Sequence, residues 1–193
     1  MAFIIDSGTE HKNKFLNGSL LNPTAGSYNS AGGYTSNNQL WGVVYYLSGK
    51  IILNGCTIEK GTTGSGNLTT AIYKYNEETE EFEKVENTNI NTWNTTATGF
   101  QTVTISETVL NPGIYLNALV ADTNSAGNHS AYTTQWPTTP LGLDSSGVVW
   151  QGLTKASFTY VSELPETLEY NSTFWTYSNA YYNKFASFLL NHI

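Results

Sequence analysis

The sequence has no arginine, few charges and one cysteine, and each scarcity excludes a class of protein. All eight basic residues are lysines, and the formal net charge is -7. Without guanidinium groups to grip phosphates, nucleic acid is not an expected partner. The lone Cys56 excludes an intramolecular disulfide framework, and its apolar neighbours favour a small buried side chain. No apolar run reaches membrane-spanning length and the N-terminus lacks signal-peptide features, so we expect no membrane insertion.

Groups that perform catalysis are also scarce. The aspartates and histidines are scattered along the chain: Asp6, Asp122, Asp144, His11, His129 and His192. No serine-nucleophile elbow, metalloprotease helix motif or zinc-ligand spacing occurs. Six glutamates lie between Glu77 and Glu86, where the pattern indicates a surface hairpin with charges guarding its edge. We therefore expect a non-enzymatic protein without cofactor or metal, although a sandwich glycosidase needs only a carboxylate pair and remains an alternative.

Threonine, asparagine, serine, glycine and tyrosine are abundant instead. Charged residues make up only 12 % of the chain, so hydroxyls and amides must wet most of its surface. From Leu40 onward, short β-rich runs alternate with turn residues at the spacing of an all-β sandwich. Ala156–Val161 looks like one of these strands, and the apolar run 185–190 is expected to be a closing strand, with a short helix as the alternative.

The clearest element is a strand, turn and strand over residues 102–122, with Asn111-Pro-Gly113 as the turn. Apolar residues occupy both faces of the second strand: Ile114, Leu116, Ala118 and Val120 on one face, and Tyr115, Leu119 and Ala121 on the other. A strand that is apolar on both faces is usually central. We expect a second sheet or a neighbouring subunit to cover it.

Two further features concern local structure. Apolar residues occupy odd positions at Ile51 and Leu53 but even ones at Cys56 and Ile58, and this phase change across Gly55 predicts a β-bulge. Residues 68–86 predict a hairpin, whose expected packing residues are Tyr73, Tyr75, Phe82 and Val85.

The chain divides at about residue 40 on composition. Residues 1–40 hold apolar groups followed by a Gly, Ser and Asn-rich stretch, which predicts an anchoring arm and tether, and residues 41–193 form the β-sandwich domain. The alternative is that the arm is an extra strand of the main domain.

Several motifs together carry a resemblance that covers roughly residues 40 to 190. They are the hairpin Ala71-Ile-Tyr-Lys-Tyr-Asn, the turn and strand Leu110-Asn-Pro-Gly-Ile-Tyr-Leu-Asn-Ala-Leu-Val-Ala, and the late Glu163-Leu-Pro-Glu166. In this succession the chain resembles the jelly-roll domain of tailed-bacteriophage fibres. The composition is similar to that of the head-fibre and tail-fibre proteins of crAss-like phages of gut Bacteroidetes.

The resemblance implies a jelly-roll-like antiparallel β-sandwich preceded by an extended N-terminal arm. It implies a homotrimeric structural protein, made in the host cytoplasm and carried on the virion surface, with attachment to the capsid favoured and attachment to the tail left open. The residues expected to attach it to capsid or other virion proteins are Phe3, Ile4, Ile5, Phe15 and Leu16. In a trimer, Tyr115 and Leu119 are the expected subunit contact.

The alternative function is a carbohydrate-binding or host-receptor-binding module of a tail fibre. Aromatic rings provide flat platforms for sugars, and Tyr132 and Trp136 in the connection 123–149 are the candidates for host-surface or mucin glycans. Trp41, Trp93 and Trp150 lie in or beside strand runs, so core packing is the better interpretation for them.

Overall fold

The computed structural model describes residues 20–21, 28–33, 39–47, 49–60, 67–93, 99–122, 128–132, 152–170, 176–178 and 187–191. Within these ranges every regular element is a β-strand, and all the strand pairings are antiparallel. The described part is therefore all-β and sandwich-like, as the sequence predicts.

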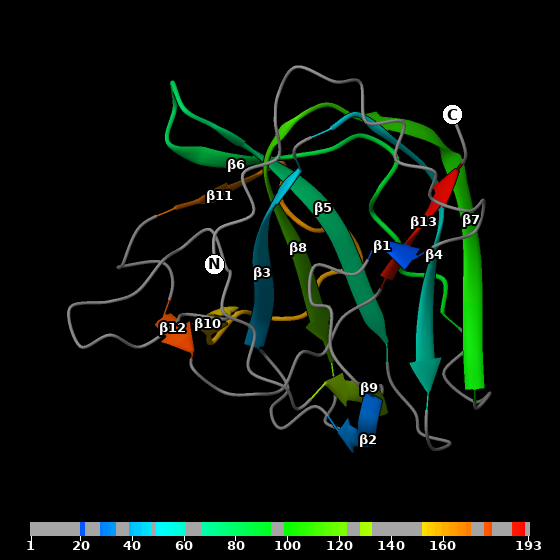
Figure 1. Ribbon diagram of the computed structural model, residues 1–193. Coiled ribbons are helices and arrows are strands. Elements are labelled where there is room, and N and C mark those ends of the chain that lie inside the picture. The colour runs from blue at the N-terminus through cyan, green and yellow to red at the C-terminus, as the bar shows by residue number, and fades with distance from the viewer. Residues whose placement is uncertain are drawn as a thin grey trace, which may run out of the picture.

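The strands form three sheets (Figure 1). The seven-stranded sheet has the order β11 (Thr167–Glu169), β6 (Glu81–Lys84), β5 (Leu68–Asn76), β8 (Gly113–Ala121), β3 (Gln39–Leu47), β10 (Gly152–Ala156), β12 (Thr176–Ser178). The four-stranded sheet has the order β1 (Leu20–Leu21), β13 (Ser187–Asn191), β4 (Ile51–Lys60), β7 (Gly99–Leu110). The small sheet pairs β2 (Tyr28–Gly33) with β9 (Asn128–Tyr132).

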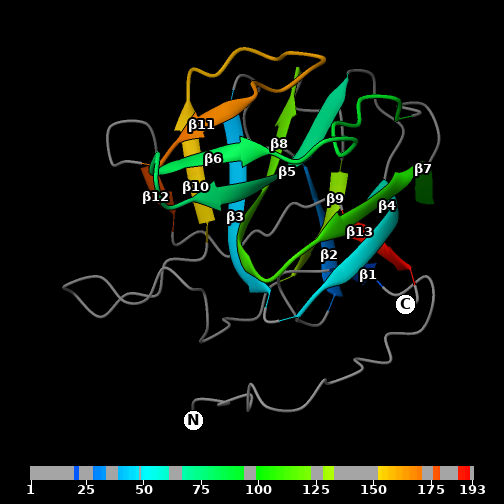
Figure 2. The same ribbon diagram turned by 90° about the horizontal axis from the view of Figure 1, so that it is seen from above.

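A bent two-stranded ribbon joins the two large sheets. Strand β3 pairs with β8 in the larger sheet, and their continuations β4 and β7 pair in the smaller one. At the corner Leu47 pairs with Gly113 on one side, and Ile51 pairs with Leu110 on the other. Figure 2 shows the stretches β3–β4 and β7–β8 bending together from one sheet into the other. The Asn111-Pro112 turn therefore links strands of different sheets and closes no hairpin.

Apolar side chains from both large sheets form an inner core. Its buried members are Leu47, Ile51, Leu53, Cys56, Leu68, Ile72, Ile90, Trp93, Leu110, Tyr115, Leu119 and Ala121. Partly buried Trp41, Val85, Val103 and Ile105 pack against it. Because these residues alternate along the strands, one face of each sheet contributes to the layer between them.

The opposite face of the seven-stranded sheet carries an outer core. It includes Leu116, Ala118 and Val120 of β8 together with Tyr73, Phe82 and other residues of neighbouring strands. Residues 157–166, the covering segment, lie over this face: Leu164 is buried there, and Phe158, Tyr160 and Val161 are partly buried. Hydrogen bonds hold the segment, including Thr69 Oγ1 to the carbonyl of Val161 and the Leu164 amide to Asn89 Oδ1.

The predictions of local structure that rest on a single sequence pattern are mostly confirmed. The register shifts between Leu53 and Gly55, which confirms the bulge. Strands β5 and β6 form the predicted hairpin, with Tyr73 and Phe82 fully buried. The closing strand is confirmed as β13, and Cys56 is buried. Ala156–Val161 is not a strand beyond Ala156, because the chain leaves β10 there to form the covering segment.

Two stretches before residue 40 form strands. Leu20–Leu21 pair with β13, and Tyr28–Gly33 pair with β9, so this part of the expected arm and tether contributes strands to the sheets. These residues therefore add short strands to two of the sheets, and the division of the chain at residue 40 stays a prediction. Residues 1–19 lie outside the described part of the chain.

Candidate functional site

The two side chains expected to contact a neighbouring subunit lie inside the chain. Tyr115 is 1 % exposed and Leu119 is fully buried, and both belong to the inner core. This corrects the expectation, because residues enclosed between the two sheets have no surface to offer a second copy. The other face of β8 is covered by the outer core, so the chain itself buries both apolar faces of the strand.

The other predicted site residues are placed only in part. The five attachment residues Phe3, Ile4, Ile5, Phe15 and Leu16 lie outside the described residues, and so does Trp136. Tyr132 is the last residue of β9, opposite Tyr28. Trp93 is buried and Trp41 is partly buried against the inner core, so both serve the packing expected of them.

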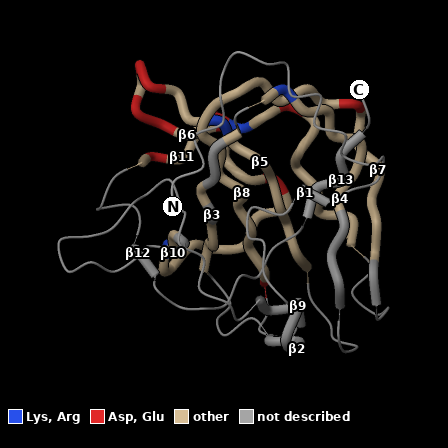
Figure 3. The backbone as a smooth tube through the Cα atoms, in the orientation of Figure 1, with Lys and Arg blue, Asp and Glu red and all other residues tan. Residues whose placement is uncertain are grey.

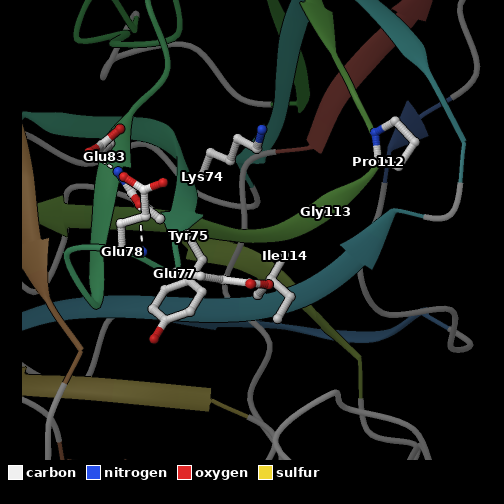
Figure 4. Close-up of a pocket in the computed structure, with 9 residues that line it drawn as sticks. Lys74, Tyr75, Glu77, Glu78, Glu83, Pro112, Gly113 and Ile114 are labelled. Carbon is white, nitrogen blue, oxygen red and sulfur yellow. Dashed lines mark hydrogen bonds between the residues drawn. The ribbon is translucent and has the colours of Figure 1, made fainter.

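The structure contains a cleft of about 540 Å³ that the sequence did not indicate. Its walls come from the end of β5, the β5–β6 turn, β6 and the beginning of β8: Lys74, Tyr75, Asn76, Glu77, Glu78, Glu83, Pro112, Gly113 and Ile114 (Figure 4). The cleft exists because the β5–β8 ladder ends at the Lys74–Tyr115 pair. Beyond it Tyr75 and Asn76 stay paired with β6, while β8 turns through Pro112 toward the other sheet.

One wall of the cleft is an ordered polar network around Asn76. Its Nδ2 donates a 2.7 Å hydrogen bond to Glu83 Oε1, and its Oδ1 accepts one of 2.9 Å from the Glu78 amide. The amide side chain thus ties the turn to β6, a frequent role of asparagine in turns. Glu83 keeps acceptor capacity on its carboxylate, since each carboxylate offers about four lone-pair sites.

The apolar part of the cleft is the rim of the outer core. The ring of Tyr75 lies 5.4 Å from that of Phe82 and 5.4 Å from that of Tyr170, in tilted and edge-on arrangements. Tyr75 and Ile114 are only partly buried, so both present apolar surface to the cleft. Figure 4 draws both side chains among the residues that line the cleft. Packing against two other rings holds Tyr75 in one orientation.

Charge in the cleft is mixed but negative. Its lining holds one ammonium, of Lys74, and the carboxylates of Glu77, Glu78 and Glu83, which gives a formal charge of -2. Figure 3 shows acidic residues gathered at the tip of the β5–β6 hairpin. The expected surface hairpin is confirmed, but β6 is not a sheet edge, because β11 pairs with it.

A second polar cluster holds the covering segment onto the sheet. Lys84 Nζ lies 2.7 Å from Glu166 and 3.1 Å from Glu163, and it donates a 2.8 Å hydrogen bond to the carbonyl of Leu164. Burial would lower the pKa of Lys84, but hydrogen bonds to the two carboxylates outweigh it and raise that pKa above its ordinary value. Tyr73 Oη donates a 2.7 Å hydrogen bond to the carbonyl of Pro165, and burial strongly raises the pKa of this phenol. This cluster is structural, because its groups are directed at each other.

No protein-family model, curated protein or solved structure was found to match the chain. Among the described residues there is no group of three or more His, Cys, Asp or Glu side chains that could hold a metal ion. The same part of the chain contains no helix long and apolar enough to cross a membrane.

Sequence reasoning identified both halves of the cleft as turns but did not bring them together. The hairpin Ala71–Asn76 and the turn Asn111–Gly113 each have a clear local signal. Their proximity depends on the β5–β8 pairing, which joins residues far apart in the chain. The signal that could have indicated the cleft is the group of polar residues just beyond the end of an expected strand pairing.

Proposed function

We propose that the chain is a non-enzymatic structural protein of a bacteriophage particle, a fibre on the virion surface whose β-sandwich projects from its point of attachment. The resemblance of residues 40–190 to jelly-roll fibre domains supports this proposal. The finer jelly-roll assignment and attachment to the head are parts of the same proposal.

The observation that carries it is the closure of the seven-stranded sheet on both faces by the chain itself. The four-stranded sheet covers one face and the covering segment covers the other, with Leu119 and Leu116 both fully buried. A module enclosed in this way needs no partner to bury its central strand. It is therefore suited to stand out from a particle with most of its surface in solvent.

The position of β1 supports attachment through the residues before it. Leu20–Leu21 pair with β13 at one edge of the four-stranded sheet. A chain that enters the sandwich at a sheet edge leaves its preceding residues free to extend away without crossing the core. In the proposal, Phe3, Ile4, Ile5, Phe15 and Leu16 dock on a capsid or other virion protein.

Immunogold labelling of purified particles tests the location. Antibodies against the Glu77–Glu86 hairpin should decorate the particle surface, at the head if the chain is a head fibre. Chain that stays in the soluble fraction of the lysate, with none in purified particles, would refute the virion role.

Deleting residues 2–19 tests the mode of attachment. The deletion spares Leu20 and Leu21 and should leave a folded protein that no longer enters particles. Incorporation at the full level would show that the docking residues lie elsewhere.

The homotrimer is part of the proposal through the resemblance alone, since the buried Tyr115 face gives it no support. Light scattering of the full chain at micromolar concentration measures the mass directly. A trimer is expected, and a monomer would remove this element of the proposal without affecting the virion location.

A further inference from the structure

We propose that the cleft between the β5–β6 hairpin and the start of β8 binds a neutral carbohydrate. Its volume of about 540 Å³ lies within the range of roughly 300–1,000 Å³ found for small-ligand sites. This places sugar recognition at Lys74–Glu78, Glu83 and Pro112–Ile114. The inference goes beyond the fibre role, because the cleft belongs to a single sandwich whether or not a particle carries it.

The aromatic component of the cleft suits the apolar face of a sugar ring. Tyr75 is partly exposed, and contacts with Phe82 and Tyr170 fix the orientation of its ring. A ring that is already ordered loses little entropy on binding, which is why rigid aromatic side chains serve well as contact platforms. Ile114 extends the same apolar surface.

The polar component suits hydroxyl groups, each of which both donates and accepts. Lys74 and Asn76 supply donors, and the carboxylates of Glu77, Glu78 and Glu83 supply acceptors. The network through Asn76 holds Glu83 and the Glu78 backbone in place before any ligand arrives. A wall that combines ordered donors and acceptors matches several hydroxyls on one ring better than it matches a group of a single kind.

The charge of the cleft narrows the class of ligand. A formal charge of -2 disfavours phosphorylated, sulfated or carboxylated sugars. The Lys74 ammonium offsets part of this negative charge, so the cleft is not a purely anionic site of the kind a cationic amine prefers. A neutral polyhydroxylated ligand avoids the repulsion and can use the donors and the acceptors of the cleft together.

Protein-observed NMR titration of the full, nitrogen-15-labelled chain tests the proposal. The probes are maltotriose, chitotriose and mannotriose as neutral sugars, a heparin disaccharide as the anion and a trilysine peptide as the cation. At least one neutral trisaccharide should bind at concentrations up to about 10 mM and shift the amide signals of Tyr75 and Gly113, with the charged probes weaker. Absence of binding by every neutral sugar, or tighter binding of trilysine, would overturn the proposal.

Substitutions locate the site. Tyr75→Leu keeps apolar packing against Phe82 and Tyr170 but removes the aromatic platform. Glu78→Gln replaces one exposed acceptor oxygen by an NH2 donor without touching the core. Each should weaken binding about tenfold. Glu86→Gln is the matched control, since Glu86 is an exposed glutamate of the same hairpin region outside the cleft. If Tyr75→Leu fails to fold, Glu78→Gln decides alone, and unchanged binding in that variant overturns the placement.

Discussion

Tyr115 Oη donates a 2.7 Å hydrogen bond to the backbone carbonyl of Asn111 and so ties the buried face of β8 to the turn that precedes it. The tyrosine is 1 % exposed, and its ring belongs to the inner core. One side chain therefore fills space between the sheets and holds the corner at which the chain passes from β7 to β8.

Tyr115→Phe should destabilise the sandwich by about 1 kcal/mol, because it removes this hydrogen bond while the ring stays in place. Urea unfolding followed by tryptophan fluorescence measures the change. The dependence on urea should keep its slope, since the surface exposed on unfolding is the same. A variant as stable as the parent would show that the bond does not hold the corner.

Stability should fall in alkaline solution because of the buried phenols. Burial raises the folded-state pKa of Tyr73 and Tyr115 above the ordinary value of 10.0. The contribution of the two phenols to the free energy of unfolding is therefore fully present below about pH 10. It is lost as the pH rises toward the folded-state pKa, because in that range the phenols of the unfolded chain lose their protons first. Urea midpoints between about pH 8 and about pH 11 measure the slope.

Tyr73→Phe should flatten this alkaline slope, since Tyr73 is fully buried. Tyr75→Phe, which changes a partly exposed phenol, is its control. Equal slopes in the two variants and the parent would contradict the assignment to Tyr73.

Gly113→Ala should destabilise the protein by about 1–2 kcal/mol. Gly113 has a backbone φ of 154°, which residues with a Cβ rarely adopt. It pairs with Leu47 at the corner. An added Cβ would lie 3.4 Å from Lys74 Cε, which can move, so the backbone conformation is the main cost. Thermal unfolding measures the loss.

Gly49→Ala is the matched control for this change. Gly49 lies in the neighbouring connection from β3 to β4, and Gly113 is the one glycine of the described residues with a positive φ. The control should stay within about 0.5 kcal/mol of the parent. A loss equal to that of Gly113→Ala would mean that added bulk at the corner, and not φ, is responsible.

Lys84→Met should loosen the covering segment at a cost of about 1–2 kcal/mol. The Lys84 side chain is 7 % exposed, whereas the side chains of Glu163 and Glu166 are 72 % and 78 % exposed. The ion pairs themselves are therefore weak, and most of the loss comes from the Leu164 carbonyl, which loses its 2.8 Å hydrogen bond. Amide exchange should rise in residues 157–166 more than in β8, and a uniform rise would contradict this local role.

Sequence patterns predicted what short-range chemistry determines. The phase change across Gly55 located the bulge, and the alternation along 114–121 identified β8 as a central strand with two buried faces. The β5–β6 hairpin followed from its turn residues. In each case a few neighbouring side chains decide the structure, so the sequence alone contains the signal.

Sequence patterns failed where the packing of distant segments determines what covers each face of a sheet. Alternation showed that Tyr115 needed a cover but could not identify it, and the cover is the four-stranded sheet of the same chain. The covering segment has a strand-like composition, yet its backbone is irregular. Its Phe158 and Tyr160 side chains pack on the outer face of the seven-stranded sheet, and this packing replaces strand pairing. The cleft was missed for the same reason, since Tyr75 and Ile114 come together only through the β5–β8 pairing.

The bent ribbon has a consequence for how the molecule comes apart. Because β3 continues into β4 and β7 into β8, the same two stretches of chain contribute strands to both large sheets. We therefore expect the two sheets to be lost together. Pairs such as Leu40 with Val120 also require distant parts of the chain to meet before either sheet gains its ladder. The sandwich should therefore fold slowly and unfold as a single cooperative unit, with the amides of Leu53 and Leu116 exchanging at the same global free energy.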